Sequence, residues 1–322
     1  MNKARYIFPA DYMADPAVHV FDGKIFIYPS HDWESGIPEN DNGDHFNMKD
    51  YHVLTMTDIN GEAHDEGVIL DLKDIPWAGR QMWDSDVACK DGKYYLYFSM
   101  KDKNDIFHIG VAVATSPYGP FIAEANPIKG SYSIDPCVLD DNGDYYLYFG
   151  GLWGGQLQRY HNNKALESAI LPEGEEPSLC GKVVKISKDM KEYAEEPRDV
   201  KVLDANGNLL KANDPHRFFE ASWMHKYNGK YYYSYSTGDT HLLCYAIGDN
   251  PYGPFIYQGV IMTPVVGWTT HHSIVEYKGK WYLFHHDCVP SEGKTWLRSL
   301  KVCELTYDTD GHIITIDGIS KG

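Results

Sequence analysis

The sequence of 322 residues contains no apolar run of the roughly 18 residues that a membrane-spanning helix requires. Its start, Met1–Asp11, has no apolar segment of the kind found in signal peptides, so we expect a cytoplasmic protein. Positive charge is scarce, because 29 lysines and arginines are outnumbered by 46 aspartates and glutamates, and the formal net charge is −17. Such a chain repels phosphate backbones and anionic lipids, which argues against nucleic acid or a membrane as a partner.

The six cysteines are scattered and show no Cys-x-x-Cys spacing, so we expect them to be free and mostly buried. No stretch has the composition of a linker, and we expect a single domain spanning residues 1–322. Aromatic residues, by contrast, are abundant. They make up 14% of the chain and include 25 tyrosines, a composition that favours β-strands.

A turn glycine followed by an aromatic run occurs five times along the chain, at Gly23, Gly92, Gly143, Gly229 and Gly279. Four of the five turns are Asp-Gly or Asn-Gly, dipeptides that favour type I′ hairpins because both central residues need positive φ. A second motif, Pro-Tyr-Gly-Pro-Phe, occurs at residues 117–121 and 251–255 and marks a turn before an outer strand. Each unit is therefore predicted to contain four strands. Five such units predict an all-β fold, a five-bladed β-propeller of four-stranded antiparallel blades.

The first strand of each propeller blade lines the central channel, so positions at equal distance before the turns should lie at similar height. The residues eight positions before the turn glycines are Asp15, Asp84, Asp135, Ala221 and His271, and Glu220 precedes Ala221. One end of the channel should therefore gather carboxyl groups and a histidine from five distant segments. Single residues of this kind often cap strand ends. Clustered carboxylates, however, repel one another and cost stability unless a function or a cation compensates.

Two carboxyl groups that face one cleft are what glycoside hydrolysis requires, one protonated and the other ionised. Around the predicted ring the sequence resembles glycoside hydrolase family 43. The segments similar to its three catalytic motifs are Ala14-Asp15-Pro16, Ser133-Ile134-Asp135-Pro136 and Phe219-Glu220-Ala221-Ser222. Residues 83–87 resemble a further family segment, although Asp84 and Ser85 replace its Ala-Pro. His271-His272-Ser273 and Arg298-Ser299 resemble the family's central histidine motif and its late arginine.

The resemblance implies a role for each carboxyl group. Asp15 would be the general base, Glu220 the general acid, and Asp135 would adjust the pKa of the acid and hold it in place. The resemblance also implies an inverting mechanism. In that case the carboxyl groups of Asp15 and Glu220 should lie about 6.5–9.5 Å apart, which leaves room for a water molecule.

Four further side chains are expected to bind substrate. Trp83 should stand beside the glycone sugar and Arg298 should contact its hydroxyls, as the resemblance implies. The alternatives are a Trp83 that only packs between blades and an Arg298 that forms a surface ion pair. His31 and Trp33, near the end of the second strand of the first unit, are expected to line the rim of the pocket.

Members of the family often carry a cation beside the central histidine. The resemblance therefore implies a divalent cation of the calcium or magnesium type near His271 on the propeller axis. The alternative is a neutral His271 that hydrogen-bonds the catalytic base or the substrate. His272 should point away, since side chains alternate along a strand. The pair His285-His286 should pack within the second strand of the last unit.

The expected substrate is a small oligosaccharide. The resemblance is to exo-acting β-xylosidases, with α-L-arabinofuranosidases or arabinanases as the alternative, because the two pentoses present similar hydroxyl patterns. A loop at residues 31–49 would close one end of the cleft and favour exo action. A fructan-cleaving propeller ranks lower because its Asn-Asp-Pro-Asn and Arg-Asp-Pro motifs do not occur. A non-catalytic sugar-binding propeller also ranks lower, since the channel-end residues differ between blades. A homo-oligomer is compatible with the sequence.

Overall fold

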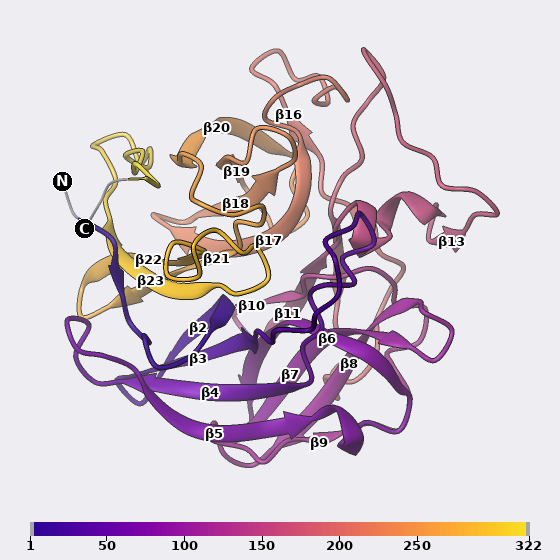
Figure 1. The fold of residues 1–322 in the computed structure, drawn as a ribbon. Helices are drawn as coiled ribbons and strands as arrows, with labels where there is room; N and C mark the ends of the chain where they lie inside the picture. The colour runs from indigo at the N-terminus through magenta and orange to yellow at the C-terminus, as the bar shows by residue number, and fades with distance from the viewer. Residues whose placement is uncertain (1–2, 320–322) are drawn as a thin grey trace.

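The computed structural model describes residues 3–319, which form five blades arranged in a ring around a central channel (Figure 1). The innermost strands β2, β6, β10, β17 and β21 contact one another in a closed cycle. The first blade consists of β2 (Met13–Phe21), β3 (Lys24–His31), β4 (Asp50–Met56) and β5 (His64–Asp71). The second consists of β6 (Ala78–Lys90), β7 (Lys93–Asp102), β8 (Phe107–Ala114) and β9 (Ile122–Ala123). The prediction of a five-bladed β-propeller is confirmed.

Of the remaining three blades, the fourth departs from the four-stranded antiparallel pattern. The third consists of β10 (Cys137–Asp141), β11 (Asp144–Phe149), β14 (Lys182–Lys185) and β15 (Arg198–Asp199). The fourth consists of β17 (Phe218–Tyr227), β18 (Lys230–Thr237), β19 (Leu243–Gly248), β20 (Phe255–Met262) and β16 (Val202–Leu203). Strand β16 pairs parallel to β20, so this blade has five strands and is mixed.

The fifth blade closes the ring with both ends of the chain. It consists of β21 (His272–Tyr277), β22 (Lys280–Asp287), β23 (Ser299–Leu305) and β1 (Arg5–Tyr6). Strand β1 pairs antiparallel with β23, where Arg5 lies opposite Val302. Strand β1 is therefore the outermost strand of the last blade. Its backbone hydrogen bonds to β23 join the first and the last strands of the described chain.

The five turns that connect the first and second strands of each blade have the geometry that their sequences predict. Both central residues have positive φ in every turn, for example 50° at Asp22 and 75° at Gly23. The fifth turn keeps this geometry with Lys278 at a φ of 51°. These tight turns give each innermost strand a fixed register with its neighbour, so equivalent positions reach the same end of the channel.

Tyrosines link neighbouring blades, which accounts for part of their abundance. The fifth residue after the turn glycine is a buried tyrosine in three blades: Tyr28, Tyr97 and Tyr148. Each hydroxyl donates to a backbone carbonyl of the next blade region, at Pro117, Met190 and Pro251, over 2.7–2.9 Å. A buried tyrosine thereby fills the space between blades and satisfies its own polar atom.

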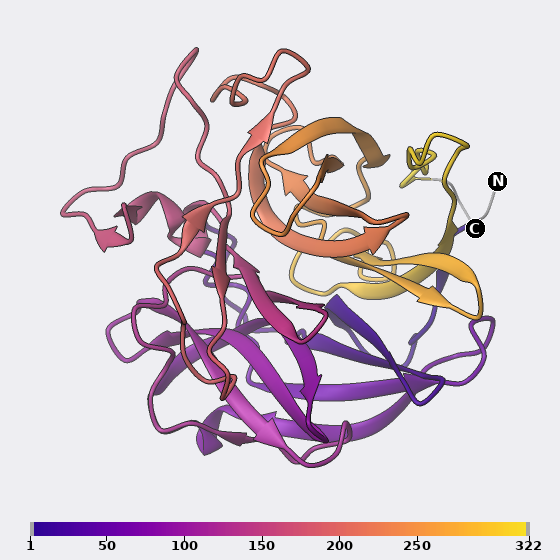
Figure 2. The ribbon, with the colours of Figure 1, turned by 180° about the vertical axis from the view of Figure 1, so that it is seen from behind.

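A segment between β11 and β14 of the third blade projects from the ring, as the two opposite views show (Figures 1 and 2). It contains the 3-10 turns η2 (Trp153–Gly155) and η3 (Leu157–Arg159) and the hairpin of β12 (Tyr160–His161) and β13 (Lys164–Ala165). The short turn η1 (Leu72–Asp74) precedes β6. The six cysteines, all within residues 3–319, are free, and five are buried. No helix in this part of the chain is long and apolar enough to cross a membrane.

Candidate active site

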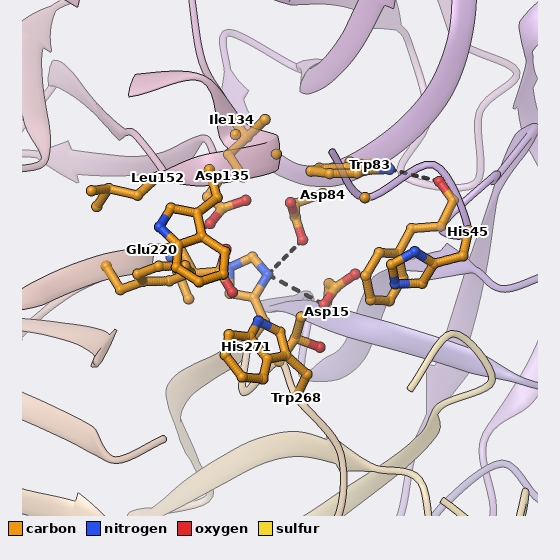
Figure 3. A pocket seen from close by; sticks show the side chains of 18 of the residues that line it. Asp15, His45, Trp83, Asp84, Ile134, Asp135, Leu152, Glu220, Trp268 and His271 are labelled. Atoms are coloured by element: carbon orange, nitrogen blue, oxygen red, sulfur yellow. Dashed lines mark hydrogen bonds and ion pairs between the residues drawn. The ribbon is translucent and has the colours of Figure 1, made fainter. Parts of the chain in front are cut away.

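A cavity with a volume of about 300 Å³ opens at one end of the channel. Its lining includes all five of the channel-end positions, namely Asp15, Asp84, Asp135, Ala221 and His271, together with Glu220 (Figure 3). The predicted register of the five blades is therefore confirmed by the way these distant residues meet around one space. Two loops, at residues 39–48 and 152–155, contribute the outer part of the wall.

The backbone turns sharply where three of the carboxyl groups enter the cavity. Asp15, Asp135 and Ala221 have φ angles of 48°, 59° and 62°, although none is a glycine. Register shifts interrupt the pairing of β2 with β3 at Ala14/Ala17 and of β17 with β18 at Glu220/Trp223. A bulge redirects a side chain, and a left-handed non-glycine residue costs on the order of 1–3 kcal/mol. The fold accepts this local strain at the positions that present carboxyl groups to the cavity.

Asp15 lies among positively charged and histidine side chains. Arg298 donates from Nη1 to Asp15 Oδ1 over 2.7 Å, and His271 Nδ1 is 3.6 Å from the same oxygen. The backbone N–H of Asp15 donates to His286 Nδ1 over 3.1 Å. Burial alone would raise the pKa of Asp15, but the charge of Arg298, with the two histidines, lowers it well below its ordinary value. Asp15 is therefore ionised at neutral pH.

Arg298 is held by a second carboxylate, that of Asp32. Its Nε and Nη2 donate to the two oxygens of Asp32 over 2.9 and 2.7 Å, and Nη1 also contacts Thr269 Oγ1 at 3.3 Å. Arg298 is only 2% exposed, so the alternative of a surface ion pair is wrong. Burial raises the pKa of Asp32 to about 6 despite the arginine. The guanidinium group of Arg298 thus fixes the Asp15 carboxylate in place. Both side chains line the cavity.

Glu220 and Asp135, which lie near Asp84, have the opposite character. Burial, together with the charge of Asp84, raises the pKa of Glu220 to about 8. The same two causes raise the pKa of Asp135 well above its ordinary value, and its carboxyl is hydrogen-bonded to that of Asp84. Asp135 Oδ2 also accepts the backbone N–H of Ala221 over 2.6 Å, directly beside Glu220. Glu220 is therefore protonated at neutral pH in the same cavity in which Asp15 is ionised.

His271 lies between the two groups of carboxyls (Figure 3). Its Nδ1 is 2.7 Å from Asp84 Oδ1. Burial would lower the pKa of His271, but Asp84 and Asp15 raise it well above its ordinary value, which argues against the alternative of a neutral His271 that only accepts or donates a hydrogen bond. His271, Asp15 and Asp84 offer one nitrogen and two carboxylate oxygens within 4.8 Å of one another. Once His271 Nδ1 has lost its proton, as a ligand histidine must, these three groups fit a divalent cation.

Aromatic side chains form much of the remaining wall. Trp83 lines the cavity, donates from Nε1 to the Phe46 carbonyl over 2.7 Å and packs on Phe107 at 4.6 Å between ring centroids. It therefore packs between neighbouring segments and also faces the cavity. Trp153 and Trp268 also line the cavity, with their rings stacked at 6.0 Å and 36–37% of their surface exposed. No repeat or motif marked these two tryptophans, although Trp268 lies only three residues before His271.

Two of the residues expected at the rim do not reach the cavity. Within the described range, residues 3–319, His31 and Trp33 are absent from its lining. His31 instead bonds Asp50 at 2.6 Å, and Trp33 packs beneath Lys49 at 5.7 Å. The loop that follows them does line the cavity, from Glu39 to Met48, as expected.

The histidines of the fifth blade differ in their contacts. His272 points away from the cavity to Ser234 at 2.6 Å, as the alternation of strand side chains predicts. His286, in contrast, packs in β22 but also contacts the backbone of Asp15, so the expectation of a purely packing role was incomplete. Asp32, Thr269 and His286 are partners of Asp15 or Arg298 that no sequence motif marked.

Known proteins that resemble this chain in sequence and structure are glycoside hydrolases. The model of the glycosyl hydrolases family 43 matches residues 14–313. The chain is 77% identical to a xylosidase/arabinosidase of Bacteroides ovatus, over 98% of each chain, and 65% identical to a beta-xylosidase of Xylanibacter ruminicola, over 98% of this chain and 99% of the relative. A family 43 beta-xylosidase/alpha-arabinofuranosidase from a compost microbial metagenome, solved with xylotriose in a calcium-free form, superposes over the full length of both chains with a TM-score of 0.96 and 56% identity. The chain belongs to glycoside hydrolase family 43.

Proposed function

We propose that the propeller is a single catalytic domain that releases xylose from the ends of β-1,4-xylooligosaccharides with inversion, and that also cleaves α-L-arabinofuranosides. The observation that supports this proposal most directly is the opposite ionisation of two carboxyl groups in one cavity. Glu220 holds its proton because its pKa is raised to about 8, whereas Arg298 keeps Asp15 ionised. An acid and a base in these states are the two catalysts that glycoside hydrolysis needs at neutral pH.

In the proposed reaction Glu220 donates its proton to the oxygen of the scissile bond as that bond to the anomeric carbon breaks. Asp15 takes a proton from a water molecule, whose oxygen forms the new bond to the anomeric carbon from the opposite face of the sugar. Glu220 ends ionised and Asp15 protonated, and exchange with solvent restores both. Asp135 holds the segment of the acid in place by accepting the backbone N–H of Ala221. The charge of the nearby Asp84 disfavours ionisation of Glu220.

The size and closure of the cavity support short substrates and exo action. A volume of about 300 Å³ is at the lower end of the range of about 300–1,000 Å³ that small-molecule pockets occupy. The loop at residues 39–48 closes one side, and Gly43 allows it to approach Trp83, since a Cβ at Gly43 would lie 2.6 Å from the indole. The names of the relatives, xylosidase/arabinosidase and beta-xylosidase, support pentose substrates.

The proposed function is tested by substrate range and product stereochemistry. We expect cleavage of xylobiose, nitrophenyl β-xyloside and nitrophenyl α-L-arabinofuranoside, with little activity on linear arabinan. NMR recorded in the first minutes of xylobiose hydrolysis should show α-xylose forming from the β-linkage. Initial release of β-xylose would contradict inversion, and activity confined to arabinan would favour an endo-arabinanase.

A divalent cation of the calcium type is part of the proposal. Asp15, Asp84 and His271 would hold it, and when bound it supplies positive charge that offsets repulsion between the carboxylates. The calcium-free description of the compost relative supports a calcium site in this family branch. Exhaustive chelation should lower kcat/KM for nitrophenyl β-xyloside, and added calcium or magnesium should restore it. Activity that is the same before and after chelation would contradict a functional cation.

A further inference from the structure

A second group of metal-ligating side chains lies outside the cavity, at the base of the loop that lines it. His31 ends β3, and Asp50 and His52 belong to the start of β4, so the group joins the two ends of the segment that connects these strands. One ligand atom from each of the three residues lies within 4.8 Å of the others. We propose that His31, Asp50 and His52 bind a divalent transition-metal ion of the zinc type, separately from any cation on the axis.

His52 is arranged as a metal ligand. Its Nδ1 lies 3.0 Å from both carboxylate oxygens of Asp65, so this nitrogen carries the proton and donates. The other nitrogen, Nε2, is buried, is without a hydrogen-bond partner among residues 3–319, and lies 3.9 Å from Asp50 Oδ1. A histidine that gives one N–H to a carboxylate and leaves the other nitrogen free has the tautomer that metal-binding histidines adopt. A buried acceptor without a partner costs stability, which a metal ion would recover.

His31 also lies between two carboxylates, and unlike His52 it already contacts Asp50. Its Nε2 lies 3.3 Å from Asp11 Oδ2, and its Nδ1 lies 2.6 Å from Asp50 Oδ1. Each histidine therefore directs one nitrogen toward Asp50 and the other toward an outer carboxylate. The two imidazole rings meet edge to face, with centroids 4.6 Å apart and planes at 72°.

The spacing suits a tetrahedral ion. Ligand atoms at about 2.0–2.1 Å from zinc lie roughly 3.3 Å from one another in a tetrahedron. The two distances to Asp50 Oδ1, 2.6 and 3.9 Å, lie on either side of that value, so small side-chain rotations suffice. The three side chains are only 9–14% exposed, which leaves a narrow approach for an ion and a water as the fourth ligand.

The donor set separates this site from the axis site. Two imidazole nitrogens and one carboxylate oxygen favour zinc, cobalt or nickel, whereas calcium and magnesium require six or more oxygen ligands or retained waters. An ion here would tie together both ends of the segment whose residues 39–48 line the cavity. We therefore expect bound zinc to raise the melting temperature, because it binds the native arrangement and not the unfolded chain.

The test is a titration of chelated enzyme with Zn²⁺ and with Co²⁺, both in saturating calcium. Wild type should bind one equivalent of Zn²⁺ saturably at this site, show the visible bands of tetrahedral Co²⁺, and melt at a higher temperature with Zn²⁺. His52→Ala should lose all three effects. Asp65→Asn, which keeps the three ligands, should bind about 10–100-fold more weakly. His64→Ala removes an exposed histidine of the same strand as Asp65 and should behave as wild type.

Near-UV circular dichroism spectra recorded without metal identify any variant that fails to fold. The Asp65→Asn variant tests the site without removal of any of the three proposed ligands. Two outcomes would overturn the proposal. One is the absence of saturable Zn²⁺ binding in wild type. The other is binding that His52→Ala and Asp65→Asn leave unchanged but that His271→Ala removes, because the ion would then occupy the axis.

Discussion

Replacing Glu220 by glutamine should lower kcat/KM for xylobiose by about 10²–10⁴-fold, the usual contribution of a general acid. The amide has nearly the same shape but has no proton to give to the leaving sugar oxygen. A nitrophenolate leaving group departs with little protonation, so nitrophenyl β-xyloside should lose much less activity. Wild-type kcat/KM should fall as the pH rises past about 8, where Glu220 ionises, and the variant should lack this alkaline limb.

Glu276→Gln is the matched control. Glu276 lies on β21 at an exposed position outside the cavity lining, so the same chemical change there should leave both activities and the pH profile unchanged. Equal losses of Glu220→Gln on both substrates would show that Glu220 positions the substrate instead of donating a proton. Wild-type activity on xylobiose would contradict the assignment of the acid altogether.

The fold could be predicted because its information is local and repeated. An Asp-Gly or Asn-Gly pair sets a hairpin turn within two residues, and the turn fixes the register of the strands that follow. Counting back from Gly23 or Gly143 therefore reached Asp15 and Asp135 without any knowledge of tertiary contacts. The fifth strand of the fourth blade could not be predicted in this way, because β16 has only two residues and pairs through a parallel contact.

The electrostatic partners of Asp15 could not be predicted, because no repeat marks them. Asp32 comes directly after β3 and His286 lies near the end of β22, and each contacts Asp15 or Arg298 where the first and fifth blades meet. Their sequence surroundings do not differ from those of other strand residues. Only the closure of the first blade against the fifth brings them together, and that closure depends on packing over about 250 residues of intervening chain.

The prediction for His31 failed for a related reason. Its position near the end of β3 correctly placed it close to the pocket loop, but sequence position does not determine the direction of a side chain at a strand end. In the structure the neighbouring strand β4 supplies Asp50 as a strong acceptor, and His31 turns to it at 2.6 Å. The same neighbouring strand brings His52 and hence creates the proposed zinc site.

Replacing Arg298 by methionine, which is close in length but uncharged, should have the second large effect. It removes the cation that holds both Asp15 and Asp32, and losing one partner of a buried ion pair typically costs about 3–5 kcal/mol of unfolding free energy. In wild type the depressed pKa of Asp15 stabilises the fold above the unfolded pKa, and this stability is lost only as the pH falls toward the folded value. In the variant, only His271 and His286 still oppose the effect of burial, so the pKa of Asp15 should rise.

A raised pKa leaves the base protonated at neutral pH. The acid limb of the kcat/KM profile of Arg298→Met should therefore move to higher pH, with a loss at neutral pH of up to about 10²–10⁴-fold. Urea unfolding measures the stability change, and pH profiles on nitrophenyl β-xyloside measure the shift. Arg198→Met is the control, because Arg198 is a surface residue paired with Glu195 and should cost less than about 1 kcal/mol with no shift of the profile. If Arg298→Met lost stability while the acid limb stayed in place, Arg298 would hold the fold together without setting the ionisation of the base.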